Sequence, residues 1–285
     1  MKKILLPTDF SHCANNAVAF AVGTAKLMQA EIILLHSFEV TGNMYTDYMG
    51  VNKEYNQSQL QDVRHKLEEL KNSIGTNHSV KVTAHVCTGP VKKCILKEIA
   101  ESAIDLMIMG TAGASGIKET LWGSKTADII GKSKVPVIAI PSDYQWKNPA
   151  KILFATNHFE DEPVLLNFLF ALAACYGAEV SVAVFTNETK DDAVIYLEHQ
   201  RKTPGYEHTL KERYHEETLT VVNLFGDEFE NTLEAYIVNN NFDMVAMVTY
   251  QRHFPDSIFH PSLTKQMAYH TKIPLIAIPA NKIEG

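Results

Sequence analysis

The sequence has 285 residues, of which 46% are hydrophobic and 21% are charged, and its formal net charge is −7. This composition is ordinary for a globular protein of two moderate domains, and no apolar run approaches the ~18 residues of a membrane span. Basic residues form only short runs, which disfavours a nucleic-acid-binding function. Thr8 and Asp9 interrupt the apolar stretch at the N-terminus, which excludes a signal peptide and predicts a cytoplasmic protein.

The first half of the chain alternates short apolar runs with helical patterns. Small and apolar residues recur at helical spacing from Ala14 to Met28, with Ser11 as the expected N-cap, and residues 89–106 return to this period after a Gly-Pro turn. Continuous apolar strands that alternate with such helices predict a doubly wound α/β domain with a parallel sheet. The predicted strands are residues 3–6, 31–36, 80–86, 106–109 and 135–140.

The second half of the chain repeats the first. Four matches in the same order indicate a tandem repeat of about 140 residues, which predicts domains at 1–143 and 149–281 joined by the polar linker 142–150. The matched pairs are KKILLPTDF (2–10) with AKILFATNHF (150–159), QAEIILLHSF (29–38) with GAEVSVAVFT (177–186), DLMIMGT (105–111) with DMVAMVT (243–249), and VPVIAIPSD (135–143) with IPLIAIPAN (273–281).

The last strand of each half is apolar and would be an exposed sheet edge in an isolated domain. Pairing of residues 135–140 with 273–278 within the chain would remove both edges. The sequence leaves open whether two whole chains also form a homodimer.

Four of the 14 glycines fall between the predicted strand 106–109 and the next helical pattern, in MGTAGASGIKETLWGSKT (109–126). Parallel sheets bind ligands at the carboxyl ends of strands, where glycines let backbone amides approach an anion. Ser124 would open a helix, whose N-terminus suits phosphate. The alternative is a glycine-rich surface loop without a ligand. Neither a P-loop nor a G-x-G-x-x-G motif is present.

The glycines are spaced as Gly110-x2-Gly113-x9-Gly123-Ser124. This spacing resembles the ATP-binding signature of the universal stress protein family. The stretches ILLPTDFS (4–11), ILLHSFE (33–39) and VPVIAIP (135–141) resemble strands of that family, and the likeness extends over both halves. The resemblance implies Rossmann-like domains with five-stranded parallel sheets of order 3-2-1-4-5, and a bound adenine nucleotide. Because single domains of the family pair through their last strands, it also implies a pseudo-dimer in which residues 135–140 pair with 273–278.

The resemblance also implies a set of binding residues. Asp9, which follows Pro7 and Thr8, would face the ribose, and the backbone near Ser37 would hold the adenine. The cofactor would be ATP, with or without Mg²⁺. The family often carries a basic or imidazole residue where Ala112 stands here. Met109 and Gly110 would flank the nucleoside, and Gly113, Gly123, Ser124 and the Lys125 backbone would bind phosphates.

The second half lacks the glycine signature. A valine, a glutamine and a proline replace the three glycines, and Pro261 has no amide hydrogen to donate. The loop instead carries His253, His260 and Arg252. A metal pair of histidines or an anion site at the arginine is a weaker alternative to an aromatic surface loop. The paired positions are Val248 with Gly110, Gln251 with Gly113, Pro261 with Gly123, Ser262 with Ser124, and Asn157 with Asp9.

Polar character predicts an exposed loop at 187–192 and an exposed helix at 198–217. The four cysteines, Cys13, Cys87, Cys94 and Cys175, show no C-x-x-C spacing and are predicted to be buried reduced thiols.

Three functions are consistent with the sequence. The first is an ATP-binding regulatory module of a stress response, with one nucleotide per chain and a protein partner that the sequence does not identify. The second is a slow ATPase or phosphotransferase, although no basic side chain is clearly aimed at a γ-phosphate. The third is a partner-binding scaffold without nucleotide.

Overall fold

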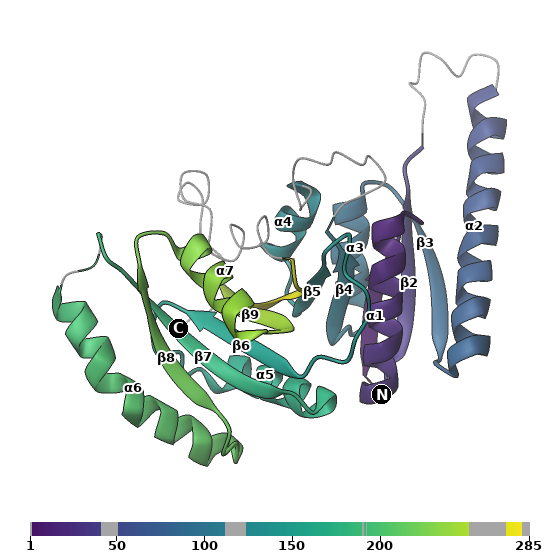
Figure 1. The fold of residues 1–285 in the computed structure, drawn as a ribbon. Coiled ribbons are helices and arrows are strands. Elements are labelled where there is room, and N and C mark those ends of the chain that lie inside the picture. The colour runs from purple at the N-terminus through teal and green to yellow at the C-terminus, as the bar shows by residue number, and fades with distance from the viewer. Residues whose placement is uncertain are drawn as a thin grey trace.

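The computed structural model describes residues 2–40, 51–111, 124–189, 191, 193–250 and 272–280, and Figure 1 shows their arrangement. The first half contains β1 (Lys3–Pro7), α1 (His12–Met28), β2 (Glu31–Phe38), α2 (Val51–His78), β3 (Val82–Thr88), α3 (Val91–Glu101), β4 (Leu106–Gly110), α4 (Ser124–Ile130) and β5 (Val137–Ile140). The second contains β6 (Lys151–Thr156), α5 (Pro163–Tyr176), β7 (Glu179–Asn187), α6 (Ala193–Tyr214), β8 (Thr220–Gly226), α7 (Phe229–Asn240), β9 (Met244–Tyr250) and β10 (Leu275–Ala280).

The strands form one sheet in the order β3-β2-β1-β4-β5-β10-β9-β6-β7-β8. Each half thus has the predicted order 3-2-1-4-5 with parallel neighbours. The two halves join where β5 runs antiparallel to β10, in the register Leu275 to Ala139 and Ala277 to Val137. This confirms the predicted pairing of the last strands. Both strands are fully buried, since each has a neighbouring strand on either side.

Helices cover both faces of the sheet, as the continuous apolar strands require (Figure 1). One core lies between the sheet and α1, α2, α5 and α6, where Phe20, Leu67, Leu169 and Leu210 are buried. The other lies under α3, α4 and α7 and includes apolar residues such as Ile95, Ile129 and Leu233.

Local signals in the sequence set several element ends. The Ser11 side chain accepts a hydrogen bond from the Ala14 amide at 3.2 Å and caps α1, as predicted. Gly177 ends α5 with φ of 67°, a conformation that glycine adopts without a steric penalty. The polar helix α6 is mostly exposed, and among its residues Leu210 is buried. Within the described parts of the chain, no helix is both long and apolar enough to cross a membrane.

An aspartate clasp repeats in the two halves. Asp105 Oδ2 accepts a hydrogen bond from the Lys3 amide at 2.8 Å, and Asp243 Oδ2 accepts one from the Lys151 amide at 3.0 Å. Each carboxylate ties the residue before the fourth strand of its half to the start of the first strand. The second clasp is more buried, since Asp243 is 8% exposed whereas Asp105 is exposed, and Asp243 also receives the Ala150 amide at 2.8 Å and pairs with the Lys147 ammonium.

The segment that joins the halves packs against both of them. Tyr144 is buried, and the Trp146 ring meets Phe20 of α1 edge to face, with ring centroids 4.8 Å apart. Across the same contact, Thr24 of α1 and Tyr176 of α5 share a buried hydrogen bond of 2.9 Å. The linker that the sequence presents as polar therefore contributes two aromatic rings to the contact between the halves.

The prediction of four reduced cysteines was wrong for two of them. Cys87 at the end of β3 and Cys94 in α3 form a disulfide, with their Cα atoms 5.8 Å apart. Spacing in the sequence did not reveal this pair, because the Gly89-Pro90 turn folds α3 back beside β3. Cys13 and Cys175 lie outside the disulfide, and the buried Cys13 thiol donates a weak hydrogen bond to the Ile140 carbonyl at 3.8 Å.

Candidate functional site

The carboxyl end of β1 is shaped by Thr8 and Asp9. The buried Thr8 side-chain oxygen accepts the Phe10 amide at 3.1 Å, and the Thr8 amide donates to the Leu35 carbonyl at 2.9 Å. The exposed Asp9 accepts the Ser11 amide at 3.0 Å through Oδ1. These bonds fix the turn from β1, which ends at Pro7, into α1. A carboxylate therefore stands at a defined place on the sheet edge.

His36 and Phe10 lie beside this turn, and the sequence did not single them out. Phe10 has φ of 62°, and its ring stacks on the His36 imidazole with centroids 4.9 Å apart. The His36 Nδ1 donates to the Thr8 carbonyl at 2.8 Å. Burial lowers the pKa of His36, against the opposing effect of that hydrogen bond. The neutral imidazole and the Phe10 ring form a stacked aromatic pair between the ends of β1 and β2.

Ser37 lies near the end of β2, opposite Cys87 of β3. Its hydroxyl donates to the Gly89 carbonyl at 2.6 Å, and the Gly89 amide donates to the Phe38 carbonyl at 2.9 Å. Gly89 has φ of 130°, which side chains rarely adopt. The end of β2 is thereby tied to the turn that precedes α3.

Met109 and Gly110 end β4, which lies next to β1. Met109 is buried, and a Cβ on Gly110 would lie 2.7 Å from the Cys13 sulfur and 3.0 Å from the Cys13 carbonyl oxygen. Glycine is therefore required at position 110 by the approach of α1, whether or not a ligand binds. The next residue, Thr111, is fully buried, and its hydroxyl has no hydrogen-bond partner among the residues described.

Most, but not all, of the predicted site residues lie among the described residues. Ser124 and Lys125 are the first two residues of α4, so the helix begins where the sequence predicted. Gly113 and Gly123 lie outside the described residues. The structure brings Pro7, Thr8, Asp9, Ser37, Met109 and Gly110 to one edge, at the carboxyl ends of the adjacent strands β2, β1 and β4.

The corresponding edge of the second half carries a cluster of His158, Glu160 and Tyr250. The Tyr250 hydroxyl donates to Glu160 Oε2 and lies 3.0 Å from His158 Nε2, which is 3.2 Å from the same carboxylate oxygen. The Glu162 amide donates to Glu160 Oε1 at 2.9 Å. As in the first half, a threonine side chain, here Thr156, accepts an amide two residues on, at 3.3 Å.

Burial would raise the pKa of Glu160, but hydrogen bonds from His158, Tyr250 and the Glu162 amide outweigh it and lower the pKa to about 2. Burial and the neighbouring carboxylate raise the pKa of Tyr250 above its ordinary value. The cluster therefore holds a carboxylate anion and a neutral phenol. It places a buried negative charge near the ends of β6 and β9.

Comparison with known proteins places the chain among its relatives. A family model described as the universal stress protein family matches residues 1–141. A universal stress protein of Methanocaldococcus jannaschii is 30% identical over 153 residues, which cover 49% of this chain and 94% of that protein. The chain belongs to the universal stress protein family. A putative universal stress protein of Staphylococcus aureus is 29% identical over 154 residues, covering 50% of this chain and 89% of the relative.

The crystal structure of a universal stress protein from Archaeoglobus fulgidus shares the fold of the whole chain. It has a TM-score of 0.74 and 16% sequence identity, and the match covers 98% of each chain. A putative universal stress protein of Pseudomonas aeruginosa matches with a TM-score of 0.66 and 12% identity, over 98% of this chain and 93% of the other. The arrangement of two halves in one chain thus recurs among universal stress proteins.

The weaker site hypotheses for the second half of this universal stress protein were a metal pair of histidines and an anion site at an arginine. Arg252, His253 and His260 lie outside the described residues. Within the part of the chain that is described, no group of three or more histidine, cysteine, aspartate or glutamate side chains is arranged to hold a metal ion.

Proposed function

We propose that this universal stress protein binds one adenine nucleotide per chain, ATP, at the carboxyl edge of its first half, and acts as a regulatory module in a stress response. The observation that carries the proposal is the meeting of the glycine signature with the topological switch point. The sheet order changes direction between β1 and β4, and Gly110, the first glycine of the signature, ends β4. Ligands of open α/β sheets bind at such a point.

The residues at this edge match the chemistry of a nucleoside. The Asp9 carboxylate can accept hydrogen bonds from ribose hydroxyls, and the backbone beside Ser37 offers groups for the edge of a base. Stacked Phe10 and His36 add a flat apolar surface between them. The glycine-rich segment and the start of α4 follow β4, and they would supply amides for the phosphates. Mg²⁺ would accompany the phosphates rather than occupy a protein site of its own.

The residues of the second half support the proposal of a single nucleotide site per chain, located in the first half. Asn157 replaces the Asp9 carboxylate, and Val248 replaces Gly110. The Glu160 carboxylate lies close to this edge and is held as an anion, which would repel a polyphosphate. An adenine nucleotide should therefore bind at the first half in preference to the second.

Asp9→Asn tests the proposal without breaking the turn. The asparagine Oδ1 can still accept the Ser11 amide, which the wild-type carboxylate accepts at 3.0 Å. The variant copies the residue of the second half. Loss of one charge-assisted hydrogen bond to the ribose should lower the affinity for ATP by roughly tenfold to a hundredfold. Titration calorimetry of the full chain measures both the affinity and the number of sites.

The phosphate contacts are tested by Gly123→Val, with Gly116→Val as the matched control. Both glycines lie in the same segment, and only Gly123 belongs to the signature. Gly123→Val should abolish ATP binding while Gly116→Val retains it. Two equivalent sites in the wild type, or unchanged affinity in folded Asp9→Asn and Gly123→Val, would contradict the proposal. Steady ATP turnover at the site would replace the regulatory role with an enzymatic one.

A further inference from the structure

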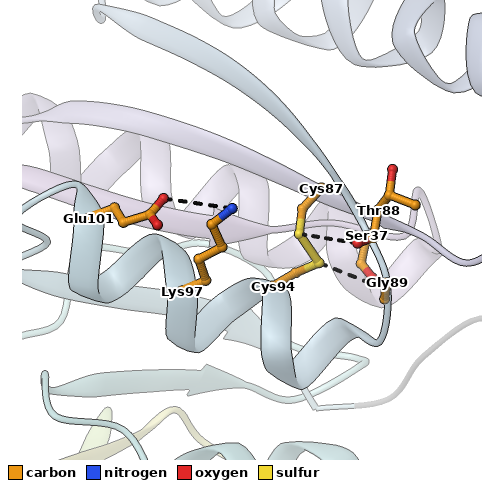
Figure 2. The surroundings of a disulfide bond; sticks show 7 residues. All are labelled: Ser37, Cys87, Thr88, Gly89, Cys94, Lys97 and Glu101. Carbon is orange, nitrogen blue, oxygen red and sulfur yellow. Dashed lines mark hydrogen bonds and ion pairs between the residues drawn. A yellow bond between two sulfur atoms is a disulfide. The ribbon is translucent and has the colours of Figure 1, made fainter.

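The disulfide joins two elements that meet beside the proposed base site. Figure 2 shows Cys94 of α3 reaching Cys87 at the end of β3, with Gly89 in the turn between them. The same turn is bound to β2 through the Ser37 hydroxyl and the Phe38 carbonyl. The disulfide therefore closes a small loop that two hydrogen bonds attach to the end of β2.

The two sulfur atoms differ in their surroundings. The Cys94 residue is 2% exposed, whereas Cys87 is only partly buried on β3, the outermost strand of the first half. An incoming thiolate can therefore approach the Cys87 sulfur more readily than the Cys94 sulfur. Cys94 also lies near the N-terminus of the 11-residue helix α3, whose positive dipole end stabilises a departing thiolate.

The structure also accommodates the reduced pair. The Cys94 sulfur lies 3.8 Å from the Gly89 carbonyl oxygen, within reach of a weak S–H hydrogen bond. This carbonyl already accepts the Ser37 hydroxyl, and a carbonyl oxygen has two lone pairs. A buried Cys94 thiol would thus have a partner, and reduction would not require the core under α3 to open.

We propose that Cys87 and Cys94 form a reversible thiol–disulfide site that reacts with small thiols of the glutathione class. A thiolate attacks the Cys87 sulfur, the sulfur–sulfur bond breaks, and Cys94 leaves as a thiolate that takes up a proton. A second thiolate attacks the mixed disulfide at the sulfur of the small thiol, and Cys87 leaves and is protonated. Overall, two thiols become one disulfide, and the protein gains two electrons and two protons.

The redox state of this site should also set nucleotide affinity, a consequence that rests on the proposed function. The closed disulfide restricts the turn that Ser37 and Phe38 hold, and so preorganises the end of β2 for the base. Reduction returns conformational freedom to the turn, which binding must then remove. ATP should bind the reduced protein roughly threefold to tenfold more weakly than the oxidised protein.

The reaction is tested by incubating the folded full chain with mixtures of reduced and oxidised glutathione, followed by an acid quench, alkylation of the denatured chain and mass spectrometry. Labels on Cys87 and Cys94 should appear together as the mixture becomes reducing and disappear on reoxidation, with an unchanged circular dichroism spectrum. Cys175→Ser removes the partly buried thiol outside the pair and should leave this titration unchanged. A pair that stays oxidised in every mixture while the chain is folded, or a pair that does not reoxidise, would overturn the proposal.

The coupling between the redox state of the disulfide and the affinity for ATP is measured by calorimetry. ATP is titrated into the oxidised wild type, the reduced wild type and the double variant Cys87→Ser/Cys94→Ser. The double variant should bind ATP with the affinity of the reduced wild type. Its affinity should be the same under oxidising and reducing conditions. Equal affinities of the oxidised and reduced wild type would overturn the coupling. Absence of ATP binding in both states would overturn the proposed function instead, while the alkylation experiment would still decide whether the site is redox-active.

Discussion

Gly23 lies inside α1 at the point where the joining segment crosses the helix. A Cβ at this position would lie 2.1, 2.2 and 2.7 Å from three carbon atoms of the Trp146 indole. These distances are far below van der Waals contact, and the ring is rigid. The absence of a side chain on Gly23 is therefore what allows Trp146 to lie against the helix and meet Phe20.

Gly23→Ala should destabilise the protein, although alanine favours a helix. Helix propensity alone would stabilise by about 1 kcal/mol. Overpacking costs about 1–3 kcal/mol, and displacing the indole from Phe20 removes an edge-to-face contact worth about 0.5–1.5 kcal/mol. The sum of these terms is a net loss of roughly 0.5–3.5 kcal/mol, which lowers the urea midpoint of unfolding.

Gly205→Ala in α6 is the matched control, since no atom lies within 4 Å of its added Cβ. That variant should be unchanged or more stable. In a Trp146→Ala background, Gly23→Ala should lose its penalty and keep only the gain in helix propensity, giving a coupling of about 1.5–4.5 kcal/mol in the double-mutant cycle. A Gly23→Ala variant as stable as Gly205→Ala would refute the placement of Trp146 on α1. A Trp122→Phe background leaves Trp146 as the single tryptophan, so its fluorescence reports displacement directly.

Three further predictions concern the repeated clasp and the two sheet edges. Asp243→Asn should cost about 1.5–3 kcal/mol in urea unfolding and Asp105→Asn less, because only Asp243 is seen to bind two amides and an ammonium; equal losses would contradict this. Gly110→Ala should lower the urea midpoint even without nucleotide, since the added Cβ meets Cys13, and an unaffected midpoint would exclude that contact. The lowered pKa of Glu160 means that its stabilisation is fully present above pH 4.5 and is lost as the pH falls toward about 2. Glu160→Gln should flatten stability over that acid range, and an unchanged pH profile would count against the cluster.

The sequence determined the architecture and the position of the candidate site. Apolar runs alternating with helical patterns indicated parallel sheets, because the period of apolar residues is a local property of each element. Four matches in the same order indicated two copies of one domain. The Ser11 cap and the start of α4 at Ser124 also followed from local rules, whereas the pairing of residues 135–140 with 273–278 followed from their apolar edges and the family resemblance. The glycine signature indicated the switch point beside β4.

Only the tertiary structure decided which distant side chains meet. The Cys87–Cys94 disulfide, the stack of Phe10 on His36 and the cluster of Glu160, His158 and Tyr250 depend on how turns and strand ends come together. Gly110 was predicted to flank a nucleoside, and the structure adds that a glycine is needed there to make room for Cys13 of α1. Periodicity fixes which face of an element is buried, whereas the identity of its neighbour across the sheet edge depends on crossover geometry and register, which a single sequence does not encode locally.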